Sequence, residues 1–243
     1  MTTLAVWTGT LILFLPAQHG YYVSADSRHD GGPAAEADEA KKIFLCGPHA
    51  VCAISGALRM TVTRPSGDAA TFDLSAALDR AARAATIDVR ANVIAAAIYA
   101  ELRTFWVQHL AMPVAARLSE RTLAPSVSTI LFAHRDPDTG KVELAQIQFP
   151  FVETQVAGGA WTHELRPPVI RPADAARPLA QGKTECMMIR ADEPPAVETR
   201  AQTLATVKAL YARTQTDDYC KSIIGGPIHV AVLDEEGARW LEP

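Results

Sequence analysis

The sequence predicts an α+β fold in which two antiparallel β-sheets are stacked between layers of helices. Three observations predict it: strand-like apolar runs come first, two helical patterns follow, and further strands, a third helix and a last pair of strands complete the order. This order suits two sheets packed face to face with helices outside them. A chain of 243 residues with 49% hydrophobic residues can bury a full core, and one domain is the natural count.

Two β-hairpins are predicted near the N-terminus, because two short apolar runs flank a turn with glycine or proline in each case. Their strands are residues 10–16 with 21–26, and Ile43–Cys46 with Val51–Ser55. Residues 27–40 lie between the two hairpins, show no periodicity and are expected to form a loop.

Two helices are predicted next. Asp73 is a suitable N-cap, and apolar residues recur at helical spacing after it and again from about Asp88 to Leu110. Strand character returns at Val127–Ala133 and Lys141–Phe149, and an Asp-Pro-Asp-Thr-Gly turn separates these runs. They are expected to form a third hairpin.

The last part of the chain is expected to combine irregular structure with one helix and a final hairpin. Seven prolines in residues 150–195 favour short strands and loops there. A helix of about 18 residues is predicted after Pro195 from its apolar periodicity. Strands at Pro227–Leu233 and Ala238–Leu241 are predicted to pair across an acidic, glycine-containing turn.

Charge and metal-binding residue types exclude several function classes. The net charge of −4 and the lack of lysine or arginine runs longer than a pair give no reason to expect nucleic acid binding. Cys46, Cys52, Cys186 and Cys220 show no CxxC spacing, so reduced, buried thiols are expected rather than a zinc or redox motif. The seven histidines have no metal-binding spacing, and no metal or organic cofactor is expected.

The apolar stretch at residues 4–16 raises the question of a targeting segment. It lacks the positive charges that precede a signal sequence, and it is too short to span a bilayer. Residues 1–9 are interpreted instead as a short propeptide before a single domain at 10–243. A cytoplasmic location without membrane association is then expected. The alternative is a start upstream of Met1 with a longer leader, which would make the protein periplasmic or secreted.

Four residues near the N-terminus are spaced like the catalytic groups of a known enzyme family. Thr10 follows Gly9, Asp26 lies in Ala-Asp-Ser-Arg, Lys42 in Lys-Lys-Ile and Gly56 in Ser-Gly. The three successive intervals from Thr10 are 16, 16 and 14 residues. These residues and intervals resemble those of proteasome-type β subunits, which are N-terminal-nucleophile hydrolases. The segment Gly225–Val232 also resembles the late glycine turn and strand of that family.

The resemblance implies a four-layer αββα sandwich, the N-terminal-nucleophile hydrolase fold, and a role for each of these residues. Thr10 would be the nucleophile once the bond after Gly9 is cut, with its own α-amine as the base. The charge of Lys42 would lower the pKa of both groups, and Asp26 would hold that lysine charged and oriented. The backbone N–H of Gly56 would stabilise the oxyanion of the tetrahedral intermediate.

Specificity and partners are also implied by the resemblance. The same register aligns Ala40, Phe44, Ile54 and Leu58 with the positions that shape the first side-chain pocket of the family. These residues predict an apolar pocket that prefers a hydrophobic residue before the cleaved bond. The implied substrate is a peptide or protein, and the implied assembly is a homo-oligomeric ring. Neither the ring size nor an ATPase partner follows from the sequence.

Two positions depart from the family pattern. When the chain is aligned on Gly225, Lys221 and Ile224 stand where β subunits usually have an aspartate and a serine that support the threonine. The mid-chain serine of the family has two candidates, Ser126 and Ser128. Two alternatives therefore stay open: a catalytically silent subunit with an assembly or binding role, and a small-amide amidase of the same superfamily.

The N-terminal residues also have simpler interpretations. Thr2 is a rival nucleophile if Met1 is removed, although eight additional residues then precede Asp26. Thr10 is otherwise an ordinary strand residue, since threonine favours strands. Asp26 and Lys42 would then be a solvated strand end and one half of an exposed lysine pair.

Overall fold

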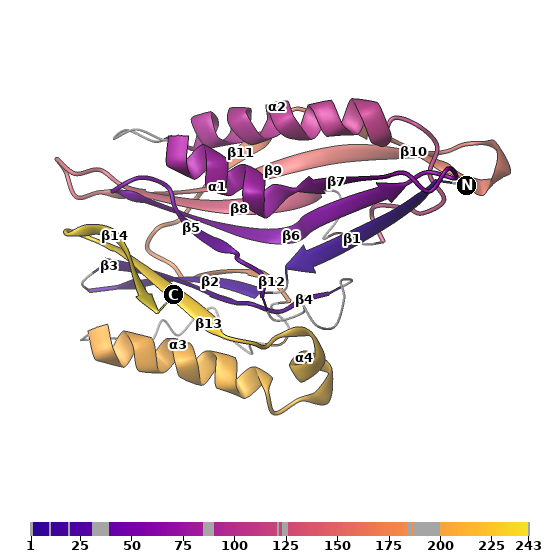
Figure 1. Ribbon diagram of the computed structural model, residues 1–243. Helices are drawn as coiled ribbons and strands as arrows, with labels where there is room; N and C mark the ends of the chain where they lie inside the picture. Colours follow the sequence, from indigo (N-terminus) through magenta and orange to yellow (C-terminus); the bar gives the residue numbers. More distant parts are fainter. Residues whose placement is uncertain are drawn as a thin grey trace.

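The computed structural model describes residues 2–9, 11–18, 20–30, 39–84, 90–120, 122, 126–183, 186 and 200–242. Within these residues the protein is an α+β structure with two antiparallel sheets and four α-helices (Figure 1). The helices are α1 (Leu74–Ala84), α2 (Ala91–His109), α3 (Arg200–Thr214) and α4 (Asp218–Ile223).

The larger sheet follows the strand path β10-β9-β8-β6-β1-β4, and three further strands pair beside it. The path strands are β1 (Thr3–Gly9), β4 (His29–Asp30), β6 (Ala50–Thr63), β8 (Ser126–Arg135), β9 (Val142–Gln155) and β10 (Trp161–Leu165). The flanking strands are β5 (Ile43–Leu45) and β7 (Ala69–Asp73), which pair with β6, and β11 (Val169–Ala173), which pairs with β9.

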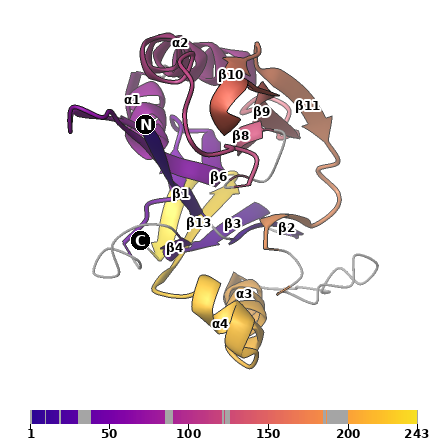
Figure 2. The same ribbon diagram turned by 90° about the vertical axis from the view of Figure 1, so that its right-hand side faces the viewer.

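The smaller sheet has five strands in the order β12-β2-β3-β13-β14. They are β2 (Leu11–Ala17), β3 (Gly20–Asp26), β12 (Leu179–Gly182), β13 (Ile228–Asp234) and β14 (Gly237–Glu242). Both views show α1 and α2 against the larger sheet, and α3 and α4 against the smaller one (Figures 1 and 2).

Buried apolar side chains form three clusters that follow this arrangement. One joins α1 and α2 to the larger sheet and includes Leu78, Ile98 and Ile130. A second contains residues from both sheets, and a third joins the smaller sheet to α3 and includes Val207 and Tyr211. Because each sheet has buried side chains on both faces, its strands contain long apolar runs in place of a strict alternation.

The structure confirms most of the expected elements. The first hairpin is β2 with β3, and the pairing of β5 with β6 confirms the second. Asp73 does cap α1, because its carboxylate accepts a hydrogen bond from the backbone N–H of Ala76 at 2.8 Å. The third and last hairpins are β8 with β9 and β13 with β14. Within residues 150–183, the three short strands β10, β11 and β12 confirm the expected short strands.

The segment before Thr10 differs most from expectation. Residues 1–9 were interpreted as a short propeptide, and no strand was predicted in them. In the structure Thr3–Gly9 forms β1, which pairs with β6 on one side and with β4 on the other. Its alternating burial, with Leu4 and Val6 inward, is the pattern of a half-buried strand.

The expectation of reduced thiols is wrong. Cys46 is bonded to Cys52, and Cys186 is bonded to Cys220. The first pair closes the β5–β6 hairpin, whose register places residues 44 and 52 opposite each other. Sequence spacing alone misses such a pair, because the hairpin turn and the register of its strands bring the two residues together. The second pair joins residues 34 positions apart in the sequence.

Candidate active site

The chain passes from the larger sheet to the smaller sheet at the candidate nucleophile. Thr10 itself lies outside the described residues. Its neighbours are Gly9, the last residue of β1, and Leu11, the first residue of β2. The described groups around these two neighbours therefore define the surroundings of the bond that would be cut.

Asp26 and Lys42 form a buried ion pair next to this point. Lys42 Nζ lies 2.9 Å from Asp26 Oδ1, and neither side chain is exposed. The same carboxylate oxygen accepts a hydrogen bond from the backbone N–H of Leu11 at 3.1 Å, and Oδ2 accepts one from that of Gly225 at 3.3 Å. Lys42 also donates to the carbonyl oxygen of Arg28 at 2.5 Å. The pair is thus tied to the residue that follows Thr10.

The burial of this pair excludes the simpler interpretations of Asp26 and Lys42 as solvated surface groups. Removing two charges from water costs several kcal/mol per ion, and their attraction offsets this only with good geometry and further hydrogen bonds. The backbone donors and the Arg28 carbonyl provide those bonds here. Nearby Tyr211 reflects the same environment, because its burial and then the charge of Asp26 raise its phenol pKa above the ordinary value. A buried cation and a fixed carboxylate therefore lie beside the Gly9–Leu11 stretch.

Gly56 lies opposite Gly9 in the β1–β6 ladder and opposite Ser128 in the β6–β8 ladder. Its φ of +94° is a backbone conformation that favours glycine, and an added Cβ would lie 3.0 Å from both Ser128 Cα and Val127 O. Ser128 donates its hydroxyl to the carbonyl of Ala57 at 2.5 Å, immediately beside this glycine. Of the two candidate serines, Ser128 is therefore the one opposite Gly56, whereas the Ser126 hydroxyl accepts a hydrogen bond from the backbone N–H of Phe149 on β9.

Thr2 lies at the opposite end of β1 from Gly9. A strand rises by about 3.3 Å per residue, so the seven steps from Thr2 to Gly9 span about 23 Å. The carbonyl of Thr2 accepts a hydrogen bond from Ala115, far from the Asp26–Lys42 pair. Thr2 is thus remote from the ion pair, whereas Leu11, the residue after Thr10, is hydrogen-bonded to it.

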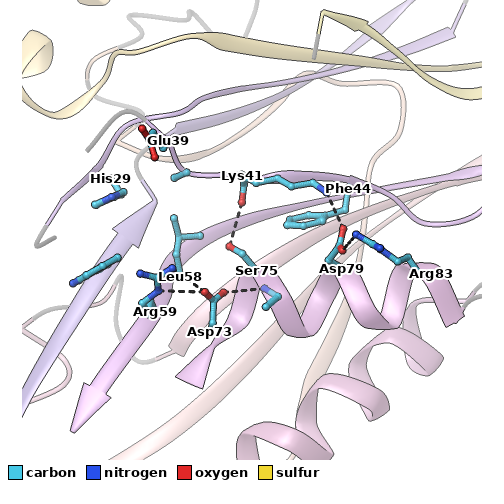
Figure 3. Close-up of a pocket in the computed structure, with 13 residues that line it drawn as sticks. His29, Glu39, Lys41, Phe44, Leu58, Arg59, Asp73, Ser75, Asp79 and Arg83 are labelled. Carbon is cyan, nitrogen blue, oxygen red and sulfur yellow. Dashed lines mark hydrogen bonds and ion pairs between the residues drawn. The ribbon is translucent and has the colours of Figure 1, made fainter. Parts of the chain in front are cut away.

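A cavity of about 440 Å³ lies between β6, residues 39–44 and α1 (Figure 3). Three of the four residues expected in the specificity pocket line it, namely Ala40, Phe44 and Leu58. The fourth, Ile54, is instead fully buried in the apolar cluster under α1 and α2. An added Cβ on Gly9 would lie 3.3 Å from the Leu58 side chain, so a side chain at position 9 would point toward this wall of the cavity.

The cavity is less apolar than expected. Figure 3 shows Arg59 with Asp73 at one end and Asp79 with Arg83 at the other. Lys41 also pairs with Asp79, at 2.7 Å, and its ammonium lies 4.7 Å from the centre of the Phe44 ring. Each of these charges has an opposite partner, and Glu39 adds a further carboxylate to the lining. The lining therefore combines an apolar wall with ion pairs and one more acidic side chain.

Sequence reasoning missed the aromatic stack at the edge of this cavity. The Trp7 ring lies parallel to the His29 ring, with centroids 5.1 Å apart and an interplanar angle of 5°. The Arg59 guanidinium lies 4.1 Å from the centre of the Trp7 ring. The alternation in residues 3–9 indicates a strand, but the strands that pair with it lie twenty or more residues further along the chain, so the sequence does not show which side chains contact Trp7.

The two departures from the family pattern have structural roles. Ile224 is fully buried in the cluster under the smaller sheet, and the carbonyl of Lys221 accepts a hydrogen bond from the Arg28 guanidinium at 2.6 Å. Arg28 in turn lies against Gly225, where an added Cβ would approach its guanidinium to 2.7 Å. The support of Asp26 from this side therefore comes from backbone groups and Arg28.

Neither a cluster of metal-ligating side chains nor a membrane-spanning helix is found in the described part of the chain. Among those residues, no group of three or more histidine, cysteine, aspartate or glutamate side chains is arranged to hold a metal ion. None of the helices found there is long and apolar enough to cross a membrane. Comparison of the sequence with known protein families and with curated proteins finds no match.

Proposed function

We propose that the protein is a threonine-type peptide or amide hydrolase that cleaves itself between Gly9 and Thr10. The observation that supports this most directly is the buried Asp26–Lys42 pair, which is hydrogen-bonded to the backbone of Leu11, the next residue after Thr10. A fully buried lysine is costly to retain for stability alone. Placed beside an N-terminal threonine, it would favour the neutral amine and the developing alkoxide.

The proposed self-cleavage begins at the Thr10 hydroxyl, next to the carbonyl of Gly9. The Thr10 hydroxyl attacks the Gly9 carbonyl carbon, and the C–N bond between the two residues breaks as the hydroxyl proton passes to the released nitrogen. Water then hydrolyses the resulting ester, which leaves the Gly9 carboxylate and a free Thr10 amine. A peptide in trans would react in the same way, with that amine as the base and Gly56 donating to the oxyanion.

The proposal extends to the fold and the assembly. The three apolar clusters support a four-layer αββα sandwich, because one lies between the sheets and the other two lie under helices. A peptide or protein substrate and a homo-oligomeric ring are proposed from the sequence resemblance. No metal or organic cofactor is needed by this mechanism.

One observation favours the second candidate, a catalytically silent subunit. Strand β1 is paired along its whole length with β6, and at its end with β4. A subunit that never cleaves itself would keep this strand as a permanent part of the larger sheet. The two candidates therefore differ in whether residues 1–9 are lost.

Intact mass of the purified full chain, followed over time, tests the proposal. We expect the wild type and a Thr10→Ser variant to lose residues 1–9, and Thr10→Ala to retain them. Thr2→Ala is the matched control and should be processed like the wild type. Retention of residues 1–9 in the wild type would exclude self-cleavage at Thr10 and favour the silent subunit.

A further inference from the structure

We infer that His29 and Arg59 form a specificity site for an aromatic side chain three residues before the cleaved bond, and that Trp7 occupies it in the uncleaved chain. The inference rests on the proposed cleavage after Gly9, since Trp7 is then the third residue on the departing side. Trp7 and Gly9 both lie beside the cavity, Trp7 as part of its lining and Gly9 against Leu58.

The pairing of β1 with β4 and β6 fixes the position of the Trp7 side chain. Trp7 is directly opposite Arg59 across the β1–β6 pair, and His29 on β4 is opposite Gly9 across the other edge of β1. Direct and diagonal neighbours on paired strands are the residues whose side chains meet. The indole is thus placed between two side chains on the two strands that flank β1, and neither of them belongs to the segment that leaves.

The charges around the stack favour a neutral ring over a charged side chain. Arg59 Nε and Nη2 donate to Asp73 Oδ2 at 3.2 and 3.1 Å, so its charge is already paired and its planar face is left for the ring. An incoming carboxylate would compete with Asp73 and face the Glu39 carboxylate, which also lines this cavity. An incoming lysine or arginine would face the Arg59 guanidinium. A tryptophan or phenylalanine ring meets neither conflict and gains a cation–π contact.

The imidazole on the other side completes the slot. His29 is only 8% exposed, and its Nδ1 has no hydrogen-bond partner among the described residues. The His29 ring lies parallel to the Trp7 ring, and the face of the indole covers the imidazole. Once β1 has left, β4 and β6 would present unpaired edges to which an extended peptide can add as a strand. The third residue of that peptide would then lie between His29 and Arg59.

The first test compares peptides on the processed wild type, so that no variant needs to fold. The frame is the protein's own sequence, Leu-Ala-Val-X-Thr-Gly-Thr-Leu, with tryptophan, phenylalanine, alanine, glutamate or lysine at X. We expect kcat/KM, measured by mass spectrometry of the products, to be roughly 10-fold higher for the two aromatic peptides than for alanine. Glutamate and lysine should be no better than alanine.

Two variants assign the preference to this site. Arg59→Met should bring the ratio of kcat/KM for the tryptophan peptide to that for the alanine peptide close to one. In the full chain, Trp7→Ala should slow self-cleavage by a similar factor and Trp7→Phe should not. Thr3→Ala, an exposed position on the same strand, is the control.

The outcomes distinguish a failure of the specificity site from a failure of the proposed hydrolase. Equal cleavage of the aromatic and alanine peptides by processed protein, or a preference for glutamate, would overturn the specificity site and leave the hydrolase intact. A wild type that neither loses residues 1–9 nor cleaves any peptide would overturn the hydrolase, and this site with it.

Discussion

Lys41 and Lys42 are adjacent in the sequence but differ in solvent exposure and in the carboxylate that each contacts. Lys41 is 53% exposed and pairs with Asp79 at the cavity wall, whereas Lys42 is fully buried against Asp26. The interval between Asp26 and Lys42 predicted their contact only through the family resemblance. Neither composition nor periodicity distinguishes a buried lysine from an exposed one, because burial depends on the packing of distant strands around it.

Replacing Lys42 by methionine should abolish self-cleavage and destabilise the protein. The variant leaves the Asp26 carboxylate buried without its cation, which typically costs about 3–5 kcal/mol of unfolding free energy. The double variant Asp26→Asn/Lys42→Met removes both charges and should recover most of that loss in denaturant unfolding, while intact mass still shows residues 1–9. Recovery of processing in the double variant would contradict a catalytic role for the pair. Lys141→Met, on an exposed turn, is the control for loss of a lysine.

Gly56→Ala should be more damaging than Gly67→Ala. Both glycines have φ near +90°, which strains any other residue by about 1–3 kcal/mol. Only at Gly56 does the added Cβ also meet backbone atoms, at 3.0 Å, because nothing lies within 4 Å of the same atom at Gly67. Thermal and denaturant unfolding of the two variants should therefore separate the steric effect from the conformational one. Equal losses would show that β8 moves aside without cost.

At the scale of elements, the sequence predicts hairpins and helices well where a local signal marks each end. Asp73 before α1 and the turns of the β2–β3 and β13–β14 hairpins are such signals. Strand β1 was missed because its apolar residues were attributed to a leader. Helix α4 was missed because six residues show less than two turns of periodicity.

The loop before β8 is held to β9 and β10 by a small polar cluster. Glu153 accepts hydrogen bonds from the backbone and hydroxyl of Ser119, and its Oε1 lies 3.1 Å from His163 Nε2. Burial lowers the pKa of His163, an effect that the charge of Glu153 only partly opposes. Burial acts to raise the pKa of Glu153, but the hydrogen bonds from Ser119 hold it below its usual range.

This cluster predicts a loss of stability on acidification. The unfolded chain binds a proton at His163 at a higher pH than the folded chain does, so stability is fully present above about 6.5 and falls as the pH drops through the lowered value. Glu153 adds a second loss in the same direction at lower pH. His163→Gln should therefore lose less unfolding free energy than the wild type between pH 7 and 5, by denaturant titration. An unchanged pH dependence would show that His163 contributes nothing to it.

At the scale of the whole molecule, the two disulfides bear on where the protein works. Disulfides persist in oxidising compartments and are rare in the cytoplasm. The pairs Cys46–Cys52 and Cys186–Cys220 are therefore more typical of a location outside the cytoplasm than of the cytoplasmic one expected from the sequence.

The two disulfides should differ in their contribution to stability. In the loop-entropy description, a bond across 34 residues contributes about 4 kcal/mol and one across 6 residues about 2 kcal/mol. The double variant Cys186→Ser/Cys220→Ser should therefore lower the melting temperature more than Cys46→Ser/Cys52→Ser does. A reducing agent should lower the melting temperature of the wild type and leave a variant without cysteines unchanged. Four reactive thiols in the denatured, unreduced protein would contradict both bonds.

The position of β1 between β4 and β6 has a consequence for timing. If the proposed cleavage after Gly9 occurs, it would not by itself open the active site, because the severed strand would still be held by its ladder to β6 and by the contacts of Trp7 with His29 and Arg59. Just after self-cleavage, the peptide of residues 1–9 would therefore still block the substrate site. Peptidase activity would rise with a lag set by the dissociation of a nine-residue peptide, and dilution after cleavage would raise the final fraction of protein that is free of it. The contacts of Trp7 with His29 and Arg59 would then set how long the cleaved peptide stays bound, and a substitution at Trp7 would change the length of the lag.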